Sequence, residues 1–280
     1  MKKNYVLLLI AALCVILSAC TKEGVYNPKE KISRIFYQSS NSNGKNLQES
    51  WTWDKNLLSK IVDENGDFRN FEYDGKQLKT VRYSNGDKLE YTYDGGKVTK
   101  AEFFSSNELY SSFTFEHDGS KISKVTVTFY DNSGNAIRAF TGLDAIFTDP
   151  VMNESVKRDI VKNRATFGTK SSTETYTYNY EWDGDNVKKM DCEYNVSGQF
   201  FTSTCTYSYD KNPNPFYRSL SEGDELVNSK NNITKYVSED SEGGYYESSY
   251  TYKYDGKFPI ERTFYGDGGY YYTSYYEYEE

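Results

Sequence analysis

Apolar and polar residues alternate along most of the chain. In the segment 88–93, Leu and Tyr occupy the odd positions, whereas Lys, Glu and Thr occupy the even positions. The segment 124–129 alternates in the same way, with Val125, Val127 and Phe129 on one side. Successive side chains of a β-strand point to opposite faces of a sheet, so the pattern predicts antiparallel strands with one apolar face and one water-facing face.

Turns that recur as a repeat join these segments. The clearest copy is Tyr91–Lys100, in which an aromatic residue and Asp-Gly precede a new apolar position. Further copies begin at Trp51, Phe71, Phe115, Tyr180, Tyr207 and Tyr252. Asp-Gly favours a type I′ hairpin turn, because both central residues of that turn need positive φ. We predict hairpins of about 20 residues, with about six to eight residues in each strand.

The repeats predict an all-β fold, in which an antiparallel meander of roughly 14–18 short strands forms a barrel or a strongly curved sheet. A single domain over residues 31–280 accommodates them, because β domains of this length are common. The pattern changes between residues 141 and 163, where Leu143, Phe147 and Ile160 follow a helical spacing. We expect a short helical insert there, which either covers an exposed end of the sheet or acts as a plug or lid.

The N-terminus has the pattern of an export signal. An apolar run from Tyr5 to Leu17 follows two lysines and is too short for an ordinary membrane-spanning helix, so residues 1–19 are predicted to be a signal peptide. Leu-Ser-Ala-Cys at 17–20 resembles the bacterial lipobox. This resemblance implies that Cys20 carries lipid and that residues 20–30 form a tether. Thr21 is not the aspartate of an inner-membrane retention signal, so we expect the outer membrane, on its periplasmic face or at the cell surface.

Charge and chemistry narrow the possible functions. The formal net charge is −8, and removal of Lys2 and Lys3 with the signal peptide makes it −10 (−8 − 2). An acidic chain is unsuited to nucleic acid, which proteins bind mainly through Lys and Arg. The sequence has no phosphate-binding loop, dinucleotide fingerprint or nucleophile motif, and no carboxylate pair stands out as acid and base. We therefore predict no catalytic residue, no cofactor, no metal and no enzymatic activity.

Two places invite a catalytic or metal-binding interpretation. His117 is the only histidine and occupies the aromatic position of the repeat. The segment Asp63–Asp67 resembles part of a calcium loop, but it contains Asn-Gly, which is first of all a turn sequence. We interpret both as structural.

Cys192 and Cys205 lie on two predicted strands that are joined by a turn near Ser197 and Gly198. They lie directly opposite each other if the loop is 198–199, and they are diagonal neighbours if the loop is 197–198. An exported chain can form disulfides. The sequence therefore predicts either a disulfide or two buried thiols.

The chain contains 29 tyrosines, more than one buried face needs. Tyr245 and Tyr246 are adjacent, as are Tyr270, Tyr271 and Tyr272. Neighbours on a strand cannot all point inward. The outward rings either stack on a glycan or small ligand, or pair across strands and stiffen the sheet. A contiguous exposed patch favours the first interpretation, and scattered rings favour the second.

Two further motifs are Asn-Pro-x-Pro-Phe at 212–216 and Ser-Lys-Asn-Asn at 229–232. With the lipobox and the serial Tyr-Asp-Gly hairpins, they resemble a family of uncharacterised Bacteroidetes lipoproteins. These carry a domain of unknown function with a porin-like β fold. The resemblance covers most of the mature chain and supplies no catalytic or binding residue.

The pattern argues against a membrane-spanning porin. Spanning strands need about 9–11 residues, and charged side chains in mid-strand are costly against lipid. We predict a water-soluble barrel or curved sheet with its apolar side inward, anchored to the membrane by its N-terminal lipid. The first functional hypothesis is a non-enzymatic structural or interaction module with an envelope protein partner. The alternative is a glycan-binding or small-ligand-binding lipoprotein that uses its exposed tyrosines.

Overall fold

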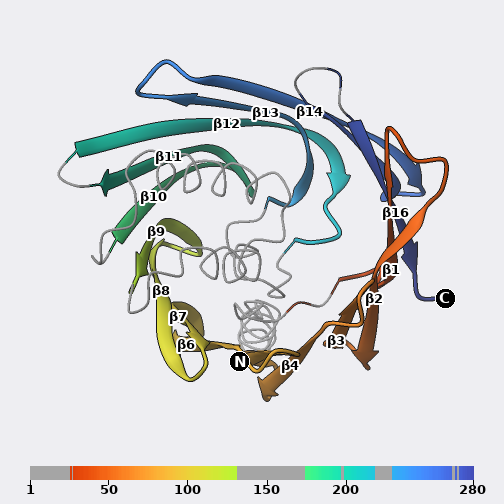
Figure 1. Cartoon of the computed structure of the whole chain (residues 1–280), viewed down its shortest axis with the longest axis horizontal. Coiled ribbons are helices and arrows are strands. Elements are labelled where there is room, and N and C mark those ends of the chain that lie inside the picture. Colours follow the sequence, from red (N-terminus) through yellow and green to blue (C-terminus); the bar gives the residue numbers. More distant parts are fainter. Residues whose placement is uncertain are drawn as a thin grey trace, which may run out of the picture.

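The computed structural model of the chain describes residues 26, 28–130, 174–196, 199–217, 229–266, 269 and 271–280. Sixteen antiparallel strands follow one another as a meander, and the last strand pairs with the first, so that the sheet closes into a barrel (Figure 1). The strands are β1 (Ile32–Ser39), β2 (Asn46–Asp54), β3 (Leu57–Asp63), β4 (Phe68–Asp74), β5 (Gln77–Tyr83), β6 (Lys88–Asp94), β7 (Lys97–Ser105), β8 (Glu108–Asp118), β9 (Lys121–Phe129), β10 (Glu174–Asp183), β11 (Asn186–Val196), β12 (Gln199–Pro213), β13 (Asn231–Asp240), β14 (Tyr245–Asp255), β15 (Phe258–Tyr265) and β16 (Tyr271–Tyr278). The structure confirms the predicted all-β meander. Of the two predicted forms, a barrel and a strongly curved sheet, the meander forms the barrel.

Many strands are longer than the repeat predicts. β3 to β6 have 7 residues each, as expected, but every strand from β7 to β14 has between 9 and 15. The prediction of six to eight residues is therefore wrong for that part of the barrel. The strands are longer because polar pairs do not end them. Ser111 and Ser112 of β8, for example, both pair with β7 and with β9. Strand length consequently gives no argument against a spanning barrel for β7 to β14, whereas β3 to β6 are shorter than the roughly 9–11 residues of a spanning strand.

The hairpin turns are displaced by one residue from their predicted place. Asp74 pairs with Gln77, so the central residues are Gly75 and Lys76 rather than Asp-Gly. Gly75 has φ +61 at the first central position, which is where a type II′ turn needs glycine. The Asp is thus the last residue of its strand. A register shift beside Tyr73 marks a β-bulge, which increases the local twist of the hairpin.

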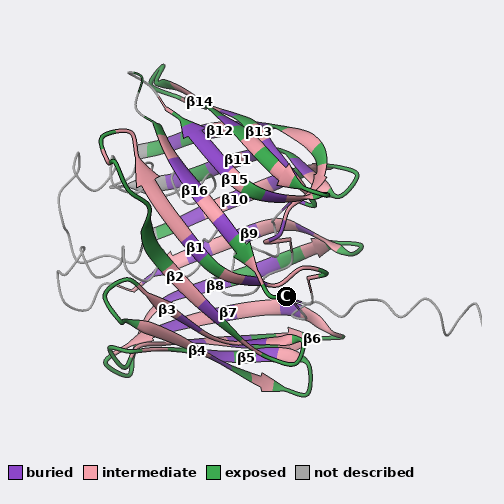
Figure 2. Ribbon diagram, turned by 90° about the vertical axis from the view of Figure 1, so that its right-hand side faces the viewer, coloured by how far each residue is buried: buried purple, intermediate pink, exposed green. Residues whose placement is uncertain are grey.

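The two faces of the wall differ as predicted. Buried residues form one hydrophobic cluster to which nearly all the strands contribute, so this cluster faces the inside of the barrel. Figure 2 shows buried and exposed positions alternating along the strands. Leu78, Val81 and Leu89 are examples of fully buried residues. Apolar burial inside a closed wall is the main favourable contribution to folding here.

All turns of the Tyr-Asp-Gly repeat lie at one end of the barrel, because successive strands of a meander run in opposite directions. The start of β1 and the end of β16 lie at the same end. We call it the Asp-Gly end.

Several predictions fall on residues outside those that the structure describes. They are the signal peptide 1–19, the lipidation site Cys20, most of the tether 20–30 and the helical insert 141–163. No helix among the described residues is long and apolar enough to cross a membrane.

Candidate functional site

In six of the seven repeat turns that the structure describes, the aromatic residue before the turn donates a hydrogen bond to a backbone carbonyl of the preceding strand. In the seventh, Tyr254 donates to the carboxylate of Asp210. Tyr73 Oη donates to Leu58 O at 2.9 Å, and Tyr93 Oη donates to Leu78 O at 2.7 Å. Pairing between β3 and β4 ends at Lys60, so the Tyr73 side chain supplies a contact where the two backbones separate. Equivalent ring-tip bonds join Trp53 to Ile32, Trp182 to Ile122 and Tyr209 to Val187. Tyr252 and Tyr278 do not directly precede a repeat turn, but they bond to Ile233 O and Pro259 O in the same way.

His117 makes the same contact as these aromatic residues. Its Nε2 lies 2.7 Å from Val98 O. A carbonyl oxygen only accepts, so Nε2 carries the hydrogen in this bond. His117 therefore replaces a tyrosine of the repeat in a structural role, as the sequence interpretation proposed.

Asp63 uses its carboxylate within its own turn. Asp63 Oδ1 accepts hydrogen bonds from Asn65 N at 2.8 Å and from Asp67 N at 2.9 Å. This is the local bonding by which Asp stabilises a turn. The segment 63–67 is thus a hairpin loop in which the Asp63 carboxylate binds backbone N–H groups of its own turn.

The outer wall carries ion pairs around the whole barrel. Arg34 Nε lies 2.7 Å from Glu277 Oε2 across β1 and β16, and Lys235 Nζ lies 2.8 Å from Glu247 Oε1 across β13 and β14. Further pairs join Arg82 to Glu72, Lys100 to Glu102, Lys124 to Glu116, Lys188 to Glu181 and Lys253 to Glu261. Charged side chains facing lipid in mid-strand are destabilising. This outer wall therefore suits contact with water.

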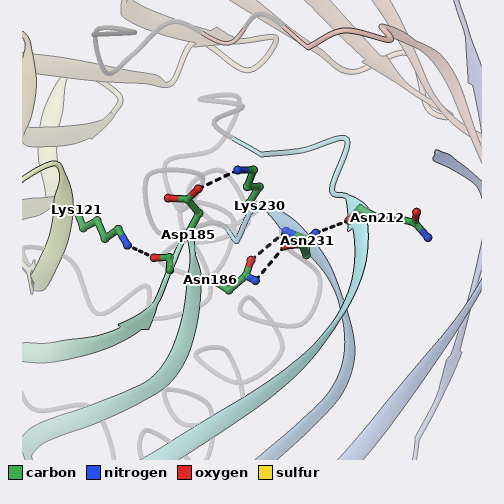
Figure 3. A network of polar contacts seen from close by, with 7 residues as sticks. Lys121, Asp185, Asn186, Asn212, Lys230 and Asn231 are labelled. Atoms are coloured by element: carbon green, nitrogen blue, oxygen red, sulfur yellow. Dashed lines mark hydrogen bonds and ion pairs between the residues drawn. The ribbon is translucent and has the colours of Figure 1, made fainter. Parts of the chain in front are cut away.

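The turn between β10 and β11 meets the Asn-Pro-x-Pro-Phe and Ser-Lys-Asn-Asn motifs at the Asp-Gly end, in the network shown in Figure 3. Asn231 N donates to Asn186 Oδ1, and Asn186 Nδ2 donates to Asn231 Oδ1, both at 3.0 Å. Asn231 Nδ2 also donates to Asn212 O at 3.0 Å. Lys230 Nζ lies 3.0 Å from Asp185 Oδ2. The network connects the turn between β10 and β11 to the end of β12 and the start of β13.

The segment after β12 crosses this end of the barrel. Tyr26 Oη donates to Pro215 O at 2.6 Å. The ring centre of Phe216 lies 6.1 Å from that of Trp51 on β2 and 5.8 Å from that of Tyr276 on β16. The Asn-Pro-x-Pro-Phe motif therefore joins β12 to the wall formed by β16 and β2. It also holds Tyr26, which precedes the first strand, at the Asp-Gly end.

The tyrosines predicted to stack on a ligand do not share one surface. Tyr245 and Tyr271 are 60% and 43% exposed. Tyr246 and Tyr272 face the interior and pack against other aromatic rings. Tyr270 lies outside the described residues. The four described rings are thus divided between the two faces, which is the arrangement expected of rings that pair across strands.

Cys192 pairs in register with Ser203, and Cys205 pairs with Met190. The two cysteines are therefore diagonal neighbours on the inner face, the second of the predicted geometries. Both are buried thiols. Diagonal neighbours lie about 7–8 Å apart, whereas a disulfide brings Cβ atoms to about 3.5–4.5 Å. The register favours two thiols over a disulfide.

The interior of the barrel has two chemically different walls. Buried residues on β3 to β9 are mainly aliphatic or Phe, whereas β12 to β16 supply Tyr, Ser and one Arg. We call the second group the tyrosine wall. It consists of Tyr207, Tyr236, Ser248, Tyr250, Tyr252, Arg262, Tyr272, Ser274 and Tyr276.

Arg262 is buried in the tyrosine wall and only 8% exposed. Its guanidinium carbon lies 5.8 Å from the ring centre of Tyr250. Burial by itself lowers the pKa of Arg262, but nearby tyrosine oxygens, those of Tyr276 and Tyr272 foremost, raise it, and the pKa ends above the ordinary arginine value. The guanidinium is therefore charged. No carboxylate within the described ranges forms an ion pair with it, although burying a single ion costs roughly several kcal/mol.

Sequence reasoning missed Arg262. One sequence signal could have indicated that Arg262 faces inward. It lies two residues before Phe264, and this spacing puts both residues on the same face of a strand. An arginine on the inward face departs from the alternation of the chain, in which charged residues take the outward positions.

Comparison with known proteins supports the architecture. The chain is similar to the crystal structure of a porin-like protein from Bacteroides vulgatus, with a TM-score of 0.59 and 12% identity over 90% of this chain and 99% of that one. A porin-like protein from Bacteroides uniformis gives a TM-score of 0.47 and 12% identity over 89% and 98% of the two chains. No family model and no curated protein matches the chain. At such low identity the first similarity shows the barrel fold alone.

Proposed function

We propose that the protein is a lipid-anchored barrel of the bacterial outer membrane that acts as a non-enzymatic structural or interaction module in the cell envelope. The observation that carries this proposal is the outer wall, whose ion pairs suit water rather than lipid. A barrel with such a wall needs a separate device to stay at a membrane. The lipobox at 17–20 provides one, and Tyr26, the first residue that the structure describes, lies at the Asp-Gly end.

Lipid labelling in cells tests the anchor. Bacteria that express the full chain are fed radiolabelled palmitate, and the label in the protein is measured beside its distribution between inner and outer membranes. We expect labelled protein in the outer membrane, with the label lost in Cys20→Ala and retained in Cys14→Ala, the matched control. A wild-type chain without label, or label retained in Cys20→Ala, contradicts the proposal.

A second candidate function is glycan binding by outward-facing tyrosines. The observation that favours it is the exposed pair Tyr265 and Tyr271, whose ring centres lie 6.1 Å apart. Two neighbouring rings on a water-facing wall offer a surface for stacking. A glycan array tests it: binding should be weakened by Tyr271→Ala and left unchanged by Tyr246→Ala, whose ring faces inward. Absence of binding to every glycan class contradicts this function.

A further inference from the structure

Three buried polar groups on the tyrosine wall have no hydrogen-bond partner in the part of the chain that the structure describes. They are the hydroxyl of Tyr207, the hydroxyl of Ser248 and Nε of Arg262. The three side chains are 8%, 2% and 8% exposed. Buried polar groups in folded proteins are nearly always hydrogen-bonded, so a group of such exceptions on one wall calls for an explanation.

The register places the three groups on one continuous stretch of the inner wall. Tyr207 pairs with Tyr236, and Tyr236 pairs with Ser248, so these three lie side by side across β12, β13 and β14. Tyr250 follows Ser248 by two positions and therefore lies on the same face of β14. The Arg262 guanidinium approaches the Tyr250 ring at 5.8 Å.

Arg262 also differs from the other arginines that the structure describes. Arg34, Arg69 and Arg82 each form an ion pair with a glutamate of the outer wall or its margin. Within the same described ranges, Arg262 has tyrosine rings and serines around it and no glutamate or aspartate in an ion pair. A buried guanidinium in such surroundings lacks the anion that normally accompanies a buried charge.

The chemistry of the wall indicates what would complete it. The planar guanidinium binds a carboxylate through two parallel hydrogen bonds. Tyrosine rings offer flat apolar surfaces, and the Tyr207 and Ser248 hydroxyls can both donate to and accept from hydroxyl groups. Ordered water can satisfy buried hydroxyls, but it does not neutralise a cation. A ligand with one carboxylate and several hydroxyl groups matches all three groups.

We propose that the tyrosine wall around Arg262 is a binding site for a small sugar acid, with Arg262 on the carboxylate and with Tyr207 and Ser248 on the hydroxyl groups. The site is inside the barrel and separate from the outward-facing tyrosines. It does not depend on the lipid anchor.

Calorimetric titration of the full chain, purified as the cell processes it, tests the proposal with glucuronate as the probe and glucose and sulfate as controls. We expect saturable binding of glucuronate that is at least tenfold tighter than that of either control. In Arg262→Met the affinity should fall by about 100-fold, as expected for loss of a charge-assisted bond. Arg82→Met, which removes an outer-wall arginine, should leave the affinity unchanged.

Thermal unfolding without ligand provides the second readout. The three groups have no hydrogen-bond partners among the described residues, so Arg262→Met and Tyr207→Phe should leave the Tm unchanged or raise it. Tyr207→Phe should still weaken glucuronate binding by about fivefold, the equivalent of one hydrogen bond. If Arg262→Met does not fold, Arg262→Lys is the substitute, because it keeps the charge. It should still weaken glucuronate binding, because lysine cannot form the bidentate contact with the carboxylate.

Three results would overturn the proposal. The first is no saturable binding of glucuronate to the wild-type chain. The second is glucuronate affinity that is unchanged in both Arg262→Lys and Tyr207→Phe. The third is binding of sulfate as tight as that of glucuronate, which would identify a general anion site and exclude a sugar-acid site.

Discussion

The donor at the tip of an aromatic ring determines how neighbouring hairpins of this barrel join. The residue before each repeat turn is Tyr, Trp or His, and each of these carries a ring-tip donor, whereas Phe does not. Apart from Tyr254, which bonds to the carboxylate of Asp210, the donor bonds to a backbone carbonyl at a place where strand pairing has stopped, as Tyr93 does with Leu78. The choice of residue in the repeat therefore follows from the backbone group that it must satisfy.

Tyr93→Phe tests this role. The substitution keeps the ring and removes only the donor to Leu78 O, so we expect the free energy of unfolding in urea to fall by about 1 kcal/mol. Tyr271→Phe is the matched control, because its ring is on the outer wall, and it should change stability by less than about 0.5 kcal/mol. Equal effects of the two substitutions would show that the ring-tip bond adds nothing.

The cysteines give a second prediction for single residues. In the chain that begins at Thr21, only Cys192 and Cys205 remain, and their diagonal register disfavours a disulfide. Protein purified without reductant should therefore show two reactive thiols with Ellman's reagent after unfolding. Fewer than one thiol per chain would mean that the two residues are oxidised.

Among the elements, the crossing segment after β12 depends on side-chain amides rather than on strand pairing. Asn231 satisfies groups on both Asn186 and Asn212. We predict that Asn231→Ala lowers the free energy of unfolding by about 2 kcal/mol, because it removes the two side-chain hydrogen bonds to half-buried groups of Asn186 and Asn212. Asn70→Ala on β4 serves as the control and should cost less than about 0.5 kcal/mol. A loss below 0.5 kcal/mol in both variants would exclude a structural role for the network.

The strands also show how much of the fold could be predicted from the sequence. Strands β2 to β9 could be predicted because each hairpin carries its own turn sequence and its own alternation. Closure could not be predicted, because the pairing of β1 with β16 joins the first strand to the last and leaves no local pattern in the sequence. The long strands were underestimated because Ser and Thr, common in turns, also continue β12 and β14.

The same limit applies to the candidate site. Alternation indicates that Arg262 and Phe264 share a face, but it does not indicate which side chains of other strands surround them. That no carboxylate of the described strands forms an ion pair with Arg262 depends on the register of β14, β15 and β16 together. The adjacent tyrosines suggested an exposed ligand surface, yet alternation divides them between the two faces, as it must for neighbours on one strand.

At the scale of the whole molecule, the closed wall separates two environments. The outer side carries ion pairs, and the inner side is aliphatic on one part and rich in tyrosine on the other. Closure removes free sheet edges, which would otherwise offer unpaired backbone groups to other chains. We therefore infer a closed barrel that folds in water, with its charged side outward.

A cross-link between the first and last strands in detergent-free buffer tests that claim most directly. Arg34 and Glu277 are partners across β1 and β16 and face outward. In the chain beginning at Thr21, the double substitution Arg34→Cys, Glu277→Cys should oxidise to a disulfide that peptide mass spectrometry locates between these positions, in a monomeric protein. Arg34→Cys with Lys235→Cys, on strands that are not neighbours, should remain reduced. A monomer without the 34–277 disulfide, or a chain that forms it only in detergent, would contradict the account.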